Sequence, residues 1–201
     1  MTAKDSAPHI LVAPLLRNKS RGLYELLQHL SKERFGAITQ RSSILVKDHP
    51  NPGDFVYGSH LTVIQIASRE LRITFKSHFT LSETQALTQK GSDARTLARV
   101  LESTQDLFME YSNLVAGGLK KELHLRSIAA GISLPLATSG FDELIASDVV
   151  RPSTFLDYWI VCGKDFQFTC SVAVDFLDET WLLAFSFEEK EDKAAGSLEI
   201  L

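Results

Sequence analysis

Glu110 and Asn113 place a charged carboxylate and a carboxamide three residues apart in the sequence. In a helix this spacing puts the two side chains one turn apart on the same face, and Asp106 and Gly117 fall within the same narrow arc. A carboxamide both accepts and donates hydrogen bonds, so it can hold a water molecule without acting as a base. The face is therefore either an ordinary solvated surface or a set of groups presented to a partner.

A long helix over residues 97–121 is predicted to position these groups, because apolar residues recur at helical spacing along the opposite side. Ser92 or Asp93 is the expected N-cap of this helix. The expected buried stripe consists of Leu97, Val100, Leu101, Leu107, Phe108, Tyr111, Leu114, Val115 and Leu119. The four residues of the polar arc then point straight away from the core.

The first half of the chain is predicted to contain both helices and strands. Alternating β-branched and aromatic residues on either side of Ser68-Arg69-Glu70 indicate a hairpin, and Ser82 is the expected cap of the helix that follows it. The expected elements are a helix from Lys19 to about Gly36, a strand or strand pair at 35–48, the hairpin at 61–80 and a helix at 81–90.

The second half repeats this order, since helix, strand and paired strands follow residue 20 and again residue 97. Its expected elements are a strand-like run from about 123 to Pro135, a short helix or turn at 141–147, two strands across Gly163-Lys164-Asp165, and a last strand at 180–189. We predict an α+β fold, a largely antiparallel sheet with long helices packed on one face.

The domain organisation follows from composition. No flexible linker separates the halves, which favours one domain with an intertwined sheet over residues 19–188. Residues 1–18 are expected to form an N-terminal lead-in, and residues 189–201 a charged tail.

The bulk properties describe an ordinary globular protein of 201 residues, 44% hydrophobic and 23% charged. The net charge of −4 gives no reason to expect nucleic acid or a membrane as partner. Cys162 and Cys170 lie in expected strands, so buried free thiols are favoured over a redox pair. Without a signal peptide or an apolar span, a reducing cytoplasm is the expected location. Six scattered histidines predict no metal site.

The spacing Asp106-x3-Glu110-x2-Asn113, followed by 21 residues and then Pro135, resembles the consensus of the CheC/CheX/FliY family of chemotaxis phosphatases. The surrounding stretch, EYSNLVAGGLKKEL, is also similar to that family. The resemblance covers roughly residues 19–188, and its sharp part is one helix and the strand after it. It implies a pseudo-duplicated CheC/CheX-like fold, most like CheX.

A fainter copy of the same pattern stands in the first half, where Glu25-x2-Gln28 is followed by 21 residues and then Pro50. Arg21 stands where the family pattern has Asp or Ser, and Gln28 stands where it has Asn. At most, Glu25 and Gln28 are therefore expected to form a degenerate second site. One active helix, as in the CheX-like members, is favoured over two, as in the CheC-like ones.

The resemblance implies dephosphorylation of a phospho-aspartate on a CheY-like receiver domain. In that interpretation Asn113 orients the attacking water, and Glu110 docks the partner by pairing with the lysine that receiver domains hold beside their phosphate. Asp106 helps to position the helix, and Gly117 lets the partner's backbone approach. The Mg2+ would belong to the partner, and this chain would need no cofactor of its own.

Two further expectations concern association. The first is an alternative function, a non-catalytic interaction or dimerisation module in a signalling complex. The second is a homodimer, because strands 158–187 are rich in Trp, Phe, Val and Leu, and an unpaired edge among them would invite pairing with a second copy.

Overall fold

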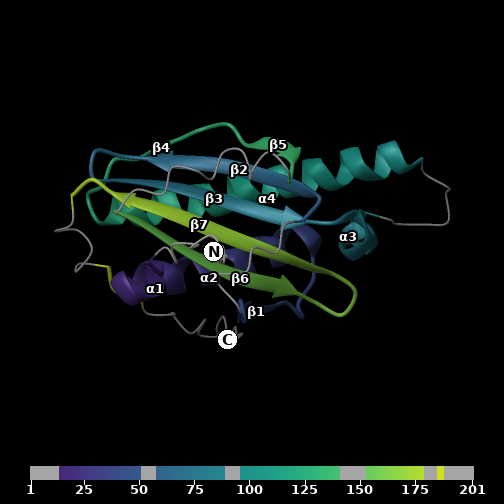
Figure 1. Cartoon of the computed structure of the whole chain (residues 1–201), viewed down its shortest axis with the longest axis horizontal. Coiled ribbons are helices and arrows are strands. Elements are labelled where there is room, and N and C mark those ends of the chain that lie inside the picture. The colour runs from purple at the N-terminus through teal and green to yellow at the C-terminus, as the bar shows by residue number, and fades with distance from the viewer. Residues whose placement is uncertain (1–13, 51–57, 89–95, 141–152, 179–184, 188–201) are drawn as a thin grey trace, which may run out of the picture.

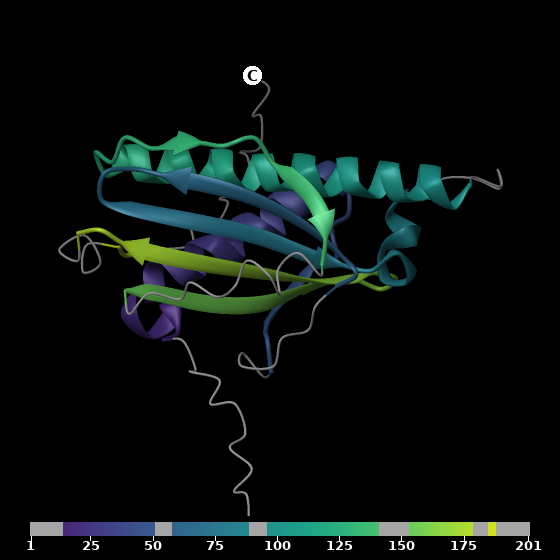
Figure 2. The same cartoon turned by 45° about the horizontal axis from the view of Figure 1, so that its top comes forward.

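The computed structural model describes residues 14–50, 58–88, 96–140, 153–178 and 185–187, in which two long helices cover one face of a sheet (Figures 1 and 2). The helices are α1 (Leu16–Lys19), α2 (Arg21–Thr39), α3 (Leu81–Thr88) and α4 (Leu97–Leu125). The strands are β1 (Leu45–Asp48), β2 (His60–Ala67), β3 (Leu71–Phe79), β4 (Gly131–Ile132), β5 (Leu136–Ser139), β6 (Thr154–Cys162) and β7 (Gln167–Phe176). The α+β prediction is confirmed.

The strand order exchanges elements between the two halves of the chain. Among the described residues the sheet runs β1-β6-β7-β3-β2-β4, with β5 also beside β2, and all of these pairs are antiparallel. The hairpins β2–β3 and β6–β7 meet at the centre, where β3 pairs with β7. Strand β1 of the first half borders the hairpin of the second half, and β4 and β5 border the hairpin of the first. The duplicated pattern of the sequence is thus an intertwined sheet.

Strands β6 and β7 each have a neighbour on both sides. The expectation of an unpaired edge within them is therefore wrong. Their apolar sequences reflect a central position in the sheet, where one face of each strand is buried against the core and most residues of the other face are half-buried. The outermost of the described strands are the short β1 on one side and β4 and β5 on the other.

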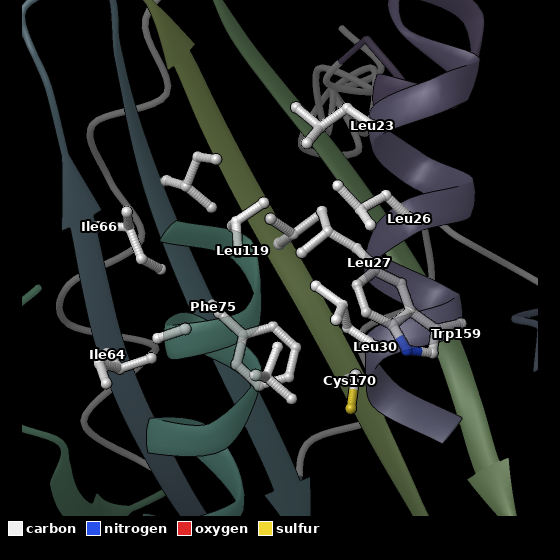
Figure 3. Close-up of a cluster of buried hydrophobic side chains, with 14 of the residues drawn as sticks. Leu23, Leu26, Leu27, Leu30, Ile64, Ile66, Phe75, Leu119, Trp159 and Cys170 are labelled. Carbon is white, nitrogen blue, oxygen red and sulfur yellow. The ribbon is translucent and has the colours of Figure 1, made fainter. Parts of the chain in front are cut away.

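The core lies between the sheet and the two long helices (Figure 3). Leucines of α2 face Leu119 of α4, and Ile64 and Phe75 approach from β2 and β3. Trp159 and Cys170 close the cluster from β6 and β7. Each fully buried side chain of this kind stabilises the fold by roughly 1.5–3 kcal/mol, so the apolar stripe of each helix fixes its rotation on the sheet.

The long helix is confirmed and extends four residues past the predicted end, to Leu125. Five members of the predicted stripe are buried, namely Val100, Phe108, Tyr111, Val115 and Leu119, and Leu101, Leu107 and Leu114 are partly buried. Leu97 is 74% exposed, so its assignment to the core was wrong. The first turns of α4 extend beyond the strands beside α3, away from the core (Figure 1).

Two helix boundaries also differ from the predictions. Helix α2 continues to Thr39 because Phe35 belongs to its buried stripe, and it ends at Gln40, which has a left-handed φ of 56°. A strand at 35–44 was therefore wrong, and only β1 remains of it. Ser82 is not a cap, because α3 begins at Leu81, and the Thr80 hydroxyl instead donates to Glu83 at 2.7 Å.

Other expectations are only partly tested. The strand-like run after Lys121 begins as helix and then gives β4 and β5. Cys162 and Cys170 are buried free thiols, as predicted. Ser92, Asp93, the segment 141–147 and the tail 189–201 lie outside the described residues. In the last predicted strand, residues 185–187 are described and are not a strand. The helix α1 was not predicted.

Candidate functional site

The polar arc of α4 faces outward. Asp106, Glu110, Asn113 and Gly117 are all exposed, whereas the opposite side of the helix is buried in the core. Within the described part of the chain, the three polar side chains make no hydrogen bond or ion pair with another residue. Their polar atoms are therefore available to a partner.

The backbone behind Asn113 is held on both sides. The Ser112 hydroxyl donates to the Phe108 carbonyl at 2.8 Å and lies 3.1 Å from Thr62 Oγ1 of β2. Tyr111 is fully buried and packs edge-on against Phe35 and Phe168. These contacts fix the rotation and height of α4 at this point of the helix.

The glycine pair at 117 and 118 serves two different purposes. A Cβ on Gly118 would lie 2.7 Å from Leu30 Cδ2, so the missing side chain allows α2 and α4 to pack closely. A Cβ on Gly117 would meet nothing within 4 Å. Gly117 therefore leaves the outer face of α4 open without any packing requirement.

Pro135 lies between β4 and β5, which pair with β2 and run along α4 (Figures 1 and 2). A proline has no N–H to donate to a ladder, which accounts for the break between these two strands. The flanking residues Leu134 and Leu136 are 90% and 62% exposed. The motif proline thus belongs to the margin of the α4 face and carries no reactive group.

The second candidate site on α2 is arranged differently. Gln28 Nε2 donates to Tyr24 Oη at 2.7 Å and to Asp48 Oδ1 at 2.9 Å, so the carboxamide is engaged within the chain. Glu25 accepts a hydrogen bond from Arg21 at 2.7 Å. The α2 face therefore lacks the pair of unengaged groups that α4 presents.

The partners of Gln28 belong to a larger network, the Asp157 cluster, which consists of Arg17, Tyr24, Gln28, Asp48 and Asp157. The carboxylate of Asp157 is fully buried, and it accepts from the Arg17 guanidinium and from the Arg17 backbone N–H at 2.9 Å. Arg17 also contacts Asp48 at 3.0 Å, and the Tyr24 hydroxyl donates to Asp48 at 2.6 Å. This hydrogen bond from Tyr24 lowers the pKa of Asp48, while burial raises the pKa of Tyr24.

The Asp157 cluster was not predicted from the sequence, because its members come from α1, α2, β1 and β6. One signal was present. Asp157 interrupts the apolar run of β6, and a carboxylate at a buried strand position needs a partner. The cluster ties α1 and the start of α2 to the sheet.

The other reactive groups of the described residues do not form a second candidate site. Burial raises the pKa of the Cys170 thiol to about 12, so it stays protonated and unreactive. Among the described residues there is no group of three His, Cys, Asp or Glu side chains that could hold a metal ion. No helix in that part of the chain is long and apolar enough to cross a membrane.

Comparison with known proteins places the fold. No protein-family model and no curated protein matches the sequence. A chain of the CheX–CheY–BeF3–Mg2+ complex from Borrelia burgdorferi matches with a TM-score of 0.57 and 13% identity, over 75% of this chain and 96% of that one. CheX from Desulfovibrio desulfuricans matches with a TM-score of 0.52 and 14% identity, over 76% and 98%. The chain has the CheX/CheC-like fold.

A CheC-like superfamily protein from Shewanella sp. PV-4 supports the same fold, with a TM-score of 0.52 and 13% identity over 76% of this chain and 97% of that chain. The match covers nearly the whole length of each of these three chains. At such low identity the likeness concerns the fold alone.

Proposed function

We propose that this protein is a phosphatase that hydrolyses the phospho-aspartate of a response-regulator receiver domain, in chemotaxis or a related two-component pathway. The observation that carries the proposal is the exposed and unengaged pair Glu110 and Asn113 on the outer face of α4. The CheX-like fold supports it, and so does the composition of one solved structure of this fold, a complex of CheX with CheY, BeF3 and Mg2+.

The reaction requires little covalent chemistry from the protein. Water attacks the phosphorus atom, the bond from phosphorus to the aspartyl oxygen breaks, and the products are an aspartate carboxylate and inorganic phosphate. Because an acyl phosphate is already reactive, the main requirement is a water molecule placed in line with the leaving oxygen. The Asn113 carboxamide accepts a hydrogen bond from this water and donates one to an oxygen near it, with no change in its own protonation.

Glu110 supplies the docking contact in this proposal. Its carboxylate lies one turn before Asn113 and pairs with a lysine of the receiver domain, which brings the carboxamide into register with the phosphoryl group. Asp106 adds a second negative charge one turn before Glu110. The Mg2+ is held by the receiver domain, where it neutralises phosphoryl oxygens.

The direct test measures loss of the phosphoryl group from a chemotaxis receiver domain labelled with a small-molecule phosphodonor, with and without this protein. Acceleration at substoichiometric protein would support the phosphatase. Binding to the receiver domain without acceleration would contradict it and favour the alternative, a non-catalytic interaction module.

Self-association is a separate prediction. Strands β4 and β5 are short and lie at the margin of the described sheet, where Leu134 and Leu136 are exposed. An apolar strand margin of this kind can pair with a second copy. We expect light scattering to give about twice the 22.3 kDa of one chain, and Leu136→Lys to shift the protein to the monomer. A wild-type mass near 22.3 kDa would refute the dimer.

A further inference from the structure

The outer face of α4 does not end at Gly117. Lys120 and Lys121 follow three and four residues later, and both are exposed. Neither has a hydrogen-bond or ion-pair partner within the described residues. In a helix, the residues at i+3 and i+4 lie over the residue at i, so both lysines are neighbours of Gly117.

The direction of helical side chains brings the lysines closer to Asn113 than their sequence numbers suggest. Every Cα–Cβ bond in a helix tilts toward the N-terminus, so long side chains lie over the turn before their own Cα. Here that turn is Gly117, where a Cβ would meet nothing within 4 Å. The two ammonium groups can therefore reach over an open stretch of helix toward the carboxamide of Asn113.

We propose that Lys120 and Lys121 form the binding site for the phosphoryl group of the phosphorylated receiver domain, over the open surface at Gly117. The inference rests on the proposed function and adds to it a means of telling the phosphorylated from the unphosphorylated partner. A lysine binds phosphate as a flexible point charge, which suits a ligand carried on another protein.

The distribution of charge along α4 supports this occupant. Asp106 and Glu110 carry negative charge before Asn113, and Lys120 and Lys121 carry positive charge after it. A phosphoryl group is repelled by the first pair and attracted by the second. A receiver domain that offers a cation next to its phosphoryl group is thus aligned along the helix in one direction, with Asn113 between the two contacts.

The α2 helix provides an internal comparison. In the register that aligns Gln28 with Asn113, Lys32 occupies the place of Gly117, and Phe35 and Gly36 occupy those of the two lysines. Phe35 is fully buried, and Gly36 has no side chain. Of the two long helices, α4 therefore has the open surface and the paired ammonium groups and α2 does not, so these features do not follow from the duplicated fold.

The test compares binding of this protein to a chemotaxis receiver domain with Mg2+ alone and with Mg2+ and beryllofluoride, a stable mimic of the aspartyl phosphate. Wild-type protein is expected to prefer the beryllofluoride form. In the double variant Lys120→Gln, Lys121→Gln, the ratio of the two dissociation constants, without and with beryllofluoride, is expected to fall about tenfold, because charge-assisted contacts to the phosphate mimic are removed. The matched control Lys32→Gln removes a lysine from the α2 face and should keep the full preference.

A second variant addresses the open surface. Gly117→Leu places a side chain between the lysines and Asn113, and it is expected to reduce the preference for the beryllofluoride form. Thermal unfolding should show no loss of stability, because the position has free space and leucine favours a helix over glycine.

The outcomes separate this inference from the proposed function. An unchanged preference in the lysine double variant would overturn the inference, even if Asn113→Ala abolishes hydrolysis and the phosphatase stands. Equal loss of affinity for both receiver forms would also overturn it, because the lysines would then only steer association. A lysine-dependent preference without any hydrolysis would support the binding site and contradict the phosphatase.

Discussion

Replacement of Asn113 by alanine is expected to lower the rate of stimulated phospho-aspartate hydrolysis by about a hundredfold or more, the loss typical when an enzyme is deprived of one orienting or stabilising group. Of the four residues of the polar arc, Asp106, Glu110, Asn113 and Gly117, only Asn113 has a side chain that both accepts from and donates to a water molecule at neutral pH, so its loss removes positioning of the nucleophile. The measurement is the first-order decay of phosphorylated receiver domain at fixed protein concentration.

Loss of activity in Asn113→Ala would not be due to unfolding of the variant. Asn113 is exposed, and alanine is a better helix former than asparagine, so the variant should unfold at the same or a slightly higher temperature. Gln28→Ala is the matched control, since it removes the corresponding carboxamide on α2, which is engaged with Tyr24 and Asp48. It should retain full hydrolysis. Retained activity in Asn113→Ala would end the phosphatase assignment.

The same assay tests whether Glu110 contributes to docking of the partner or to the chemical step. Glu110→Gln keeps the shape of the side chain and removes its charge, so we expect a higher KM for the phosphorylated receiver domain with a smaller change in kcat. A fall in kcat with unchanged KM would instead place Glu110 at the reacting atoms.

The largest expected effect on stability comes from the Asp157 cluster. Asp157→Ala should lower the free energy of unfolding by about 3 kcal/mol or more, because it removes a fully buried carboxylate from a charged hydrogen-bonded pair and leaves Arg17 without that partner. Urea denaturation of the full chain gives the value directly.

Two further variants test whether burial of the Asp157 carboxylate is the cause of this loss of stability. Asp165→Ala breaks the exposed ion pair with Arg41 and should change stability far less. The double variant Arg17→Met, Asp157→Leu removes both charges and should recover part of the loss, since a buried ion pair often has an apolar replacement of similar stability. Equal losses in Asp157→Ala and Asp165→Ala would contradict a special role for the cluster.

Local patterns in the sequence were sufficient for much of the fold. The buried stripe of α4 and the two hairpins follow from periodicity, and the outward direction of Glu110 and Asn113 follows from their spacing on that helix. The predictions of burial and of helix ends were wrong where contacts between distant parts of the chain determine them. Leu97 fits the stripe but lies beyond the sheet, and Phe35 extends α2 because the core of the other half receives its ring.

The Asp157 cluster could not be assembled from the sequence, because its partners meet only after four elements pack together. The state of Gln28 is a direct example. Its spacing from Glu25 predicts a weakened copy of the α4 site, whereas its hydrogen bonds give it a structural role. Contacts within the described part of the chain thus distinguish the two carboxamides, because Gln28 is hydrogen-bonded and Asn113 is not.

The exchange of border strands between the halves has a consequence for how the chain folds. Residues 45–48 pair with residues 159–162, more than a hundred positions later, and β2 pairs with β4 and β5 of the second half. The first half therefore cannot complete its strand pairing until the second half has been synthesised and has collapsed onto it. Loop closure over such distances is slow, which predicts millisecond-to-second folding in one cooperative step. Fragments 1–92 and 93–201 should each remain largely unfolded alone and acquire near-native circular dichroism when mixed. A fragment that folds alone would show that this exchange is not required for stability.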